Sequence, residues 1–262
     1  MLRGTPLFLW AAVCCSCRPP EAPETLDELA SYLFEHVWDD DEDYLQPGLE
    51  NLVVWLDAHF EETSVGYEVT NLDPDAVASV TGEPRNLEGL IGAAVGYDVG
   101  FSPEEVVDVM VFHDPLEVYP GDYEEYTREY LSDTECFKER TCSKLSYNVH
   151  LVANYPLGIT GESDTHVQYH WVELENGPAA IYRNWTRWSP EISADWLKVK
   201  QQYYLSATLP KADGTTRRIA AMWLEAEIVN ANIPESMALN MTIDTMAKAG
   251  GQMESYLTSL VE

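Results

Sequence analysis

The stretch NIPESMALNMTIDTMAKAGGQMESYLTSLVE, residues 232–262, predicts one long helix around which the rest of the chain is organised. Pro234 stands where the first helical turn tolerates a missing N–H. Apolar residues recur at alternating spacings of four and three, which gathers them on one face of the helix. Such a face needs a broad apolar surface to pack against. The members of this stripe are Leu239, Ile243, Met246, Gly250, Met253, Leu257 and Leu260.

The region before this helix predicts the surface on which it packs. From about residue 144 to residue 229, apolar and polar residues alternate in segments separated by turns, as in antiparallel strands with one buried face. The expected fold class is therefore α+β, a curved antiparallel sheet packed on the long C-terminal helix. The predicted strands are 91–100, 146–154, 165–174, 179–188, 197–209 and 217–229.

The N-terminal part of the chain predicts a helical hairpin. Thr25 and Glu28 form a capping box ahead of a helix over 25–38, in which apolar residues follow helical spacing. A second helix is expected over 47–60. The hairpin precedes the sheet and is connected to it by a less regular stretch.

Residues 102–105 predict the start of a shorter helix directly after the strand 91–100. Ser102 occupies the N-cap position, Pro103 the first helical position and Glu105 the position that completes a capping box. The helix is expected to end near residue 111, ahead of an Asp-Pro stop.

This order of elements resembles a known superfamily. A strand, an S-P-E-E-V helix start, an Asp-Pro stop, and then antiparallel strands ended by Ile-Pro and a long helix are similar to the helix-grip (SRPBCC) superfamily of START lipid-transfer domains, polyketide cyclases and the birch-pollen allergen. The resemblance covers roughly residues 90–260 and implies a sheet wrapped around the C-terminal helix, with an apolar ligand between them. The chain departs from the family at 122–133, where tyrosines at helical spacing predict a helix: Tyr123, Tyr126 and Tyr130.

The first residues resemble a bacterial lipoprotein signal. An apolar run over 6–13, too short to span a bilayer as a permanent helix, leads to three closely spaced cysteines. Cys17 is the best candidate for the residue that carries diacylglycerol, because Ser16 supplies the small residue expected before the cut. Cys15 is the next candidate, and Cys14 stands where Leu or Val is usual. An ordinary secretory signal is the alternative.

The signal predicts a lipid-anchored protein of the cell envelope, with a membrane as partner. Arg18 stands where an aspartate marks inner-membrane retention, which favours the outer membrane. The expected organisation is a signal peptide over 1–16, a tether over 17–24, a helical N-terminal region over 25–86 and the helix-grip-like α+β domain over 87–262.

The charge balance excludes one class of partner. The chain has 45 acidic and 15 basic residues and a net charge of −30, so it lacks the basic side chains that nucleic acid requires. In an oxidising compartment, Cys136 and Cys142 are expected to form a disulfide that closes a tight loop.

Two groups of residues suggest metal ligands, each with a simpler alternative. Acidic residues between the two N-terminal helices have the spacing of an EF-hand calcium loop, but Tyr44 replaces the glycine of its sharp turn, so a solvated acidic linker is favoured over calcium. Three histidines in the predicted strands can be placed close enough to hold zinc, with His150 near His170, but polar sheet residues are the favoured interpretation. The candidate ligands are Asp39, Asp41, Asp43 and Glu50, and His150, His166 and His170.

The strands and the C-terminal helix also contain candidate ligand-binding residues. Aromatic and methionine side chains can line an apolar pocket, and two arginines on one strand face can receive a carboxylate or phosphate; core packing and surface ion pairs are the alternatives. The candidates are Trp171, Arg183, Trp185, Arg187, Tyr203, Trp223, Met246 and Met253.

The expected function is binding or transfer of a hydrophobic small molecule or lipid between the sheet and the C-terminal helix. One alternative is a cyclase or hydrolase that uses the same cavity, with His150, His166 or His170 as acid or base. Another is a structural lipoprotein without a ligand. No nucleophile motif and no phosphate-binding glycine loop is present in the sequence, and no cofactor is expected.

Overall fold

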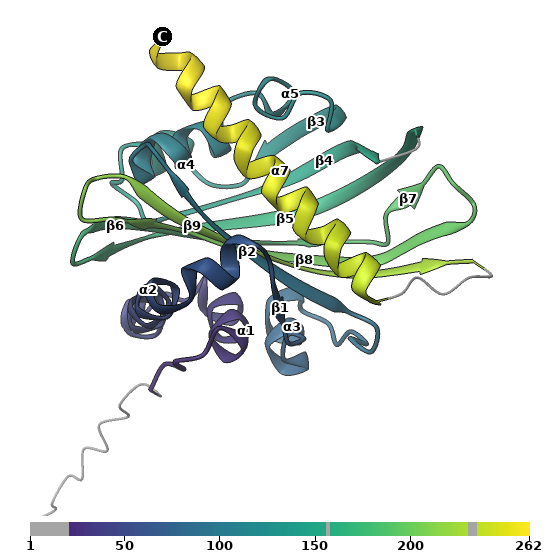
Figure 1. The fold of residues 1–262 in the computed structure, drawn as a ribbon, viewed down its shortest axis with the longest axis horizontal. Coiled ribbons are helices and arrows are strands. Elements are labelled where there is room, and N and C mark those ends of the chain that lie inside the picture. Colours follow the sequence, from purple (N-terminus) through teal and green to yellow (C-terminus); the bar gives the residue numbers. More distant parts are fainter. Residues whose placement is uncertain (1–20, 156–157, 230–234) are drawn as a thin grey trace, which may run out of the picture.

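The computed structural model describes residues 21–155, 158–229 and 235–262. They form an α+β fold with a large curved antiparallel sheet, a long C-terminal helix and N-terminal helices, which confirms the predicted fold class (Figure 1). The helices are α1 (Leu26–His36), α2 (Glu42–Ser64), α3 (Pro74–Thr81), α4 (Pro103–Phe112), α5 (Pro115–Val118), α6 (Thr134–Lys138) and α7 (Glu235–Val261).

The sheet has nine strands: eight follow the order β1-β2-β9-β8-β6-β5-β4-β3, and β7 pairs with β5 near its start, at Gly161 and Glu162. All of its pairings are antiparallel. The strands are β1 (Tyr67–Val69), β2 (Ile91–Val99), β3 (Tyr123–Tyr130), β4 (Lys144–Tyr155), β5 (Ile159–Leu174), β6 (Gly177–Thr186), β7 (Glu191–Ile192), β8 (Leu197–Pro210) and β9 (Thr216–Ile228).

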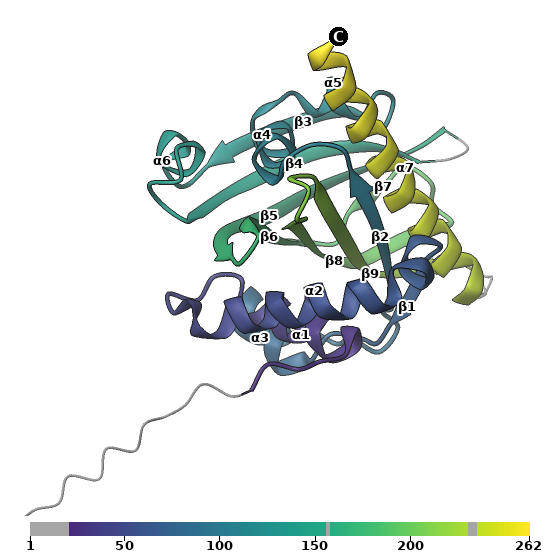
Figure 2. The same cartoon turned by 60° about the vertical axis from the view of Figure 1, so that its left-hand side comes forward.

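Helices cover both faces of the sheet. We call the face crossed by α7 the inner face, and the face that α1, α2 and α3 cover the outer face; Figure 2 shows these three layers. On the outer face, Phe34 of α1 and Leu49 of α2 share one hydrophobic cluster with Ile181, Tyr203 and Trp223 of the sheet. The region 25–86 therefore shares a core with the strands that follow it.

The start of the described chain is held against α2. The side-chain nitrogen of Asn51 donates hydrogen bonds to the carbonyl oxygens of Ala22 and Pro23, at 3.0 and 2.9 Å. Asn51 lies on α2, so the chain enters the fold on the side of the outer face.

The helix α7 packs on the inner face through the predicted stripe. Met246, Met253 and Leu257 are buried, whereas Leu260 is 51% exposed beyond the end of the contact. Gly250 allows a close approach, because a Cβ placed there would lie 2.9 Å from the ring of Tyr97 on β2. Within the described residues, no helix is long and apolar enough to span a membrane.

The capping box predicted for α4 is present. The backbone N–H of Glu105 donates to the hydroxyl of Ser102, and the backbone N–H of Ser102 donates to the carboxylate of Glu105 at 2.9 Å. Two orphan N–H groups at the start of α4 are thereby satisfied.

The helix predicted over 122–133 was wrong, since this segment contains the strand β3. A β-bulge between Tyr123 and Glu125 places Tyr123 opposite Ala153 and Tyr126 opposite Leu151. Residues three apart thus reach the same face of the sheet, and the bulge imitates the spacing of a helix.

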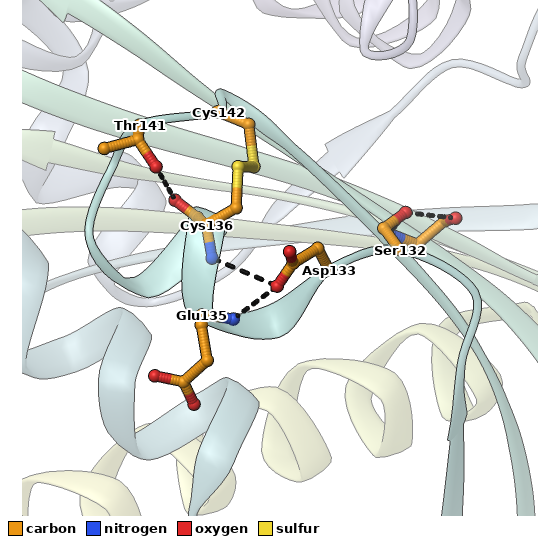
Figure 3. The surroundings of a disulfide bond; sticks show 7 residues. Ser132, Asp133, Glu135, Cys136, Thr141 and Cys142 are labelled. Carbon is orange, nitrogen blue, oxygen red and sulfur yellow. Dashed lines mark hydrogen bonds between the residues drawn. A yellow bond between two sulfur atoms is a disulfide. The ribbon is translucent and has the colours of Figure 1, made fainter.

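The predicted disulfide between Cys136 and Cys142 is confirmed (Figure 3). Cys136 lies in α6, whose start is capped by Asp133: its side-chain oxygen accepts hydrogen bonds from the backbone N–H groups of Glu135 and Cys136, at 3.0 and 3.2 Å. The helix carries Phe137 into a hydrophobic cluster with Leu145, Tyr147, Tyr169 and Trp171, which we call the inner-face cluster. The ring of Phe137 lies 5.8 Å from that of Trp171. The disulfide therefore closes the loop that holds a core residue.

Candidate functional site

The inner face carries a row of four stacked tyrosines on adjacent strands, which we call the tyrosine row. It consists of Tyr147 on β4, Tyr169 on β5, Tyr182 on β6 and Tyr204 on β8. The ring centroids of successive members lie 6.2, 4.6 and 5.4 Å apart, and the rings are within 23° of parallel. The register causes this arrangement, since Tyr169 lies directly opposite Tyr182 and the other two are diagonal neighbours.

Two members of the row keep part of their surface accessible in the middle of the sheet. Tyr182 and Tyr204 are half-buried, whereas Ile181 and Tyr203, their chain neighbours on the outer face, are both 0% exposed. At these two positions, packing closes the outer face more completely than the inner face. Tyr182 and Tyr204 therefore keep aromatic surface that the packing on the inner face does not fully cover.

The phenol groups of this region stay neutral at physiological pH. Burial raises the pKa of Tyr182 well above its usual range and raises that of Tyr204 to about 12. Burial also raises the pKa of Tyr169. A neutral phenol donates one hydrogen bond and adds no negative charge to the site.

Arg218 of β9 is the most unusual group on the inner face. It is 2% exposed, yet its guanidinium contacts only neutral groups: Nη2 donates to the Ser206 hydroxyl at 2.8 Å, and Nη1 donates to the Tyr97 hydroxyl at 2.8 Å and to the Met253 sulfur at 3.4 Å. In the part of the chain that the structure describes, its Nε–H has no hydrogen-bond partner.

The charge of Arg218 is retained despite its burial. Burial acts to lower its pKa, but the phenol groups of Tyr97, Tyr182 and Tyr204 raise it above the usual arginine value through the charge that they acquire at high pH. At neutral pH the guanidinium is therefore protonated beside neutral phenols. The neighbouring Arg217, on the outer face, instead pairs with the carboxylates of Asp98 and Asp57 at 2.8 and 2.7 Å. Only the outer-face arginine of this adjacent pair has carboxylate partners among the described residues.

Two further inner-face N–H donors lack partners among the described residues. They are Nε1 of Trp171 and Nε of Arg128. Arg128 uses its other nitrogens to hold the C-terminal end of α4, donating to the carbonyl oxygens of His113 and Met110 at 2.8 and 3.0 Å. The inner face thus combines aromatic and apolar surface with unpaired donors, which is chemistry for binding an apolar molecule that carries acceptors.

Three of the candidate ligand-binding residues lie on the inner side, and none of the four tyrosines of the row was among these candidates. Trp171 packs in the inner-face cluster beside Tyr169. Met246 and Met253 are buried on the face of α7 that meets the sheet. Because side chains alternate between the two faces along β5, β6 and β8, the sequence could have placed Tyr169, Tyr182 and Tyr204 on the face opposite to their neighbours His170, Arg183 and Tyr203.

Four other candidates lie on the outer face, beneath α1. Trp185, Tyr203 and Trp223 belong to the cluster formed with the N-terminal helices. Arg183 donates to the carbonyl oxygens of Phe34 and Glu35 at the end of α1, and burial lowers its pKa to about 9. The sheet separates these residues from the inner face. The remaining candidate, Arg187, is exposed beside Trp188.

The three candidate histidines do not converge. His150 lies opposite Asp164 and His170 lies opposite Lys144, so the expectation that His150 falls near His170 was wrong. The hairpin is longer than predicted, because β4 and β5 pair as far as Tyr155 and Ile159, and this shifts the register.

Each histidine has its own local partner. Nδ1 of His150 lies 3.1 Å from Asp164, and Nδ1 of His166 lies 2.9 Å from the side-chain oxygen of Asn148. His170 is buried and bonds the Val37 carbonyl oxygen at 2.9 Å, and burial lowers its pKa to about 4.

The acidic candidates for a calcium loop instead bind neighbouring groups of the protein. Asp41 caps α2 by accepting the Asp43 N–H at 3.0 Å, Asp39 pairs with His36, and Glu50 accepts from Gln46 at 2.9 Å. Among the described residues, no group of three or more His, Cys, Asp or Glu is arranged to hold a metal ion. Cys17 lies outside the described residues.

A small pocket is present away from the inner face. It has a volume of about 200 Å³ and lies between α2 and the β8–β9 turn, where Arg217 and Asp57 already pair with each other. Ligand pockets for drug-sized molecules are commonly about 300–1,000 Å³. This pocket is therefore small for a ligand site, and the charged groups that line it are already paired.

No protein-family model and no curated protein sequence matches this chain. Solved structures with a similar shape include a STAR-related lipid transfer protein from Xanthomonas axonopodis, at 13% identity and a TM-score of 0.41 over 66% of this chain and 96% of that chain. The human StarD13 lipid transfer and protein localization domain matches at 13% identity and a TM-score of 0.38, over 79% and 96%. Human STARD10 matches at 10% identity and a TM-score of 0.40, over 78% of this chain and 79% of that chain. These values describe a distant likeness in shape, from which no ligand or activity is carried over.

Proposed function

We propose that this protein binds a hydrophobic small molecule or lipid between α7 and the inner face of its sheet. The observation that carries the proposal is the half-buried surface of Tyr182 and Tyr204, set against the closed packing of the same strands on the outer face. Aromatic faces offer a large contact area for an apolar body. The flexible side chains of Met246 and Met253 can adjust to its shape.

Binding is favoured over catalysis by the placement of the three candidate histidines. An enzyme that used this site would need an acid or base beside the bound molecule. His150, His166 and His170, the candidates for that role, alternate along their strands with the inner-face residues Val149, Val167 and Tyr169 and therefore lie on the outer face.

The test is native mass spectrometry of a soluble form that begins at Pro19. After incubation with mixed bacterial lipids, we expect one apolar molecule bound per chain. Tyr182→Trp, which adds volume on the inner face, is expected to weaken binding about tenfold or more, a loss of about 1.4 kcal/mol. The control Trp188→Phe alters an exposed aromatic residue and is expected to leave binding unchanged. A bare protein mass after incubation would refute the proposal.

We further propose that the chain is exported and lipid-anchored through Cys17 at the outer membrane. The support is the sequence of the first seventeen residues, with its apolar run and the Ser16-Cys17 pair. Expression in a Gram-negative host with Cys17→Ser is expected to move the protein from the membrane fraction to the soluble periplasm. If Cys15→Ser releases the protein instead, the anchor lies at Cys15.

A further inference from the structure

We propose that the ligand of the inner face is an acidic amphiphile, an apolar body with one carboxylate or phosphate group, and that Arg218 is the receptor for that group. This inference rests on the proposed function and names the chemical class of its ligand. It is carried by a buried guanidinium whose contacts are two hydroxyl groups and a thioether.

The first step of the argument is the uncompensated charge. A buried ion is costly unless an opposite charge or a full set of hydrogen bonds replaces its hydration. The chain has 45 acidic residues, yet the described part of it brings no carboxylate within ion-pair distance of Arg218. Arg183, the other deeply buried arginine, instead has two backbone carbonyl oxygens and the Gln168 side chain as acceptors. Arg218 is thus the group whose environment an anionic ligand would improve most.

The second step is the number of free donors. A guanidinium has five N–H donors, of which the contacts to Ser206, Tyr97 and Met253 use three. The N–H of Nε and one N–H of Nη2 remain, and these two nitrogens share one edge of the planar group. This edge matches the two oxygen atoms of a carboxylate or phosphate in a bidentate pair.

The third step is access to the guanidinium. Met253 and the ring of Tyr97, whose centroid lies 5.5 Å from the central guanidinium carbon, contact it. A thioether is a weak acceptor on a side chain with three rotatable bonds. An acidic group that displaces the Met253 sulfur exchanges a weak contact for a charge-assisted hydrogen bond.

The tyrosine row gives the apolar body its position. It begins at Tyr204, two residues from Ser206 on β8, and crosses to Tyr147 on β4. Three strand spacings separate its ends, a distance of roughly 14 Å. With the acidic group on Arg218, the apolar body contacts the accessible rings of Tyr204 and Tyr182, whereas Tyr169 and Tyr147 are already buried by the protein.

The experiment compares three ligands that share a hexadecyl chain or its length: palmitic acid, hexadecyl phosphate and hexadecanol. Their Kd values are measured by tryptophan fluorescence titration for the wild type, Arg218→Met, Arg218→Lys and Arg217→Met. We expect the wild type to bind an acidic ligand about 30-fold or more tighter than hexadecanol, as for a buried hydrogen-bonded charge pair. The two acids separate a carboxylate site from a phosphate site.

The variants identify the receptor. Arg218→Met is expected to bring the three Kd values within about threefold of one another while hexadecanol still binds. Arg218→Lys is expected to retain an intermediate preference, because an ammonium keeps the charge but not the bidentate edge. The control Arg217→Met, with its side chain on the outer face, is expected to keep the wild-type preference.

Unfolding of the ligand-free variants separates a receptor from a structural arginine. Arg218→Met removes a buried charge and is expected to leave Tm unchanged or raised. Equal wild-type Kd values for all three ligands, or a lowered Tm together with an unchanged preference in Arg218→Met, would overturn this inference and leave the proposed function standing. If no ligand binds the wild type, the proposed function fails and this inference fails with it.

Discussion

The approach of α7 to the sheet can be tested with two adjacent glycines. A Cβ at Gly250 would lie 2.9 to 3.2 Å from three atoms of the Tyr97 ring, whereas a Cβ at Gly251 would meet nothing within 4 Å. Both residues are helical, so each change to alanine gains about 1 kcal/mol of helix propensity. Crowding of Tyr97 applies to Gly250→Ala alone and costs about 1–3 kcal/mol, as overpacking does in other cores.

We therefore expect Gly251→Ala to raise the free energy of unfolding by about 1 kcal/mol. Gly250→Ala is expected to leave it unchanged or to lower it by up to about 2 kcal/mol, so that the two variants differ by about 1–3 kcal/mol. Urea unfolding followed by tryptophan fluorescence measures both values. In thermal unfolding the same difference corresponds to roughly 2–4 °C per kcal/mol for a chain of this size.

A double-variant cycle assigns the difference to Tyr97. Replacing Tyr97 by Leu in both backgrounds is expected to remove most of the gap between the two glycine variants, because the crowded ring is gone. If Gly250→Ala and Gly251→Ala raise the free energy of unfolding equally, the Tyr97 ring moves aside without a loss of stability. The close approach at Gly250 would then have no part in setting the position of α7.

Three further changes test the outer face and the disulfide loop. Arg183→Met is expected to lower the free energy of unfolding by about 2–4 kcal/mol, because the carbonyl oxygens at the end of α1 lose their hydrogen-bond donor. The control Arg187→Met, at an exposed position, should change this free energy by less than about 0.5 kcal/mol, and urea unfolding measures both. Between pH 6.5 and about 4, the unfolded state protonates His170 while burial keeps the folded state neutral, so falling pH should remove about 3 kcal/mol of stability. An unchanged pH slope in His170→Gln would contradict this. Replacing Cys136 and Cys142 by serine should cost about 2 kcal/mol by chain entropy, and an unchanged Tm would argue against it.

Elements with strong local signals were predictable from the sequence. The stripe on α7 and the Ser102–Glu105 capping box depend on residues three and four apart, so their chemistry is complete within one segment. The long strands β5 and β8 alternate clearly, and their existence followed from that pattern. The bulge in β3 was not predictable, because it shows only in the pairing of Tyr123 and Tyr126 with β4.

The position of the candidate site was less predictable than the fold. Alternation separates Tyr182 from Arg183 and Arg218 from Arg217, but it does not say which side each helix covers. Here helices cover both faces of the sheet, and both faces carry buried aromatic side chains. From the sequence, Arg183 and its outer-face neighbours therefore looked as suitable for lining a pocket as the tyrosine row. Arg218 could have been singled out as a charged residue that shares a strand face with Ala220 and Met222.

The contact of Asn51 with the first described residues fixes where the N-terminal segment leaves the fold, and so bears on the orientation that the proposed anchor at Cys17 would give the molecule. Ala22 is held against α2, and the five residue-to-residue steps from Cys17 to Ala22 span at most about 18 Å. A chain attached at Cys17 would rest on its N-terminal helices and turn α7 toward the aqueous phase. A ligand released past α7 would then enter the aqueous compartment or pass to an acceptor that faces it. For the ligand to return to the anchoring membrane, the whole domain would have to turn over on its tether.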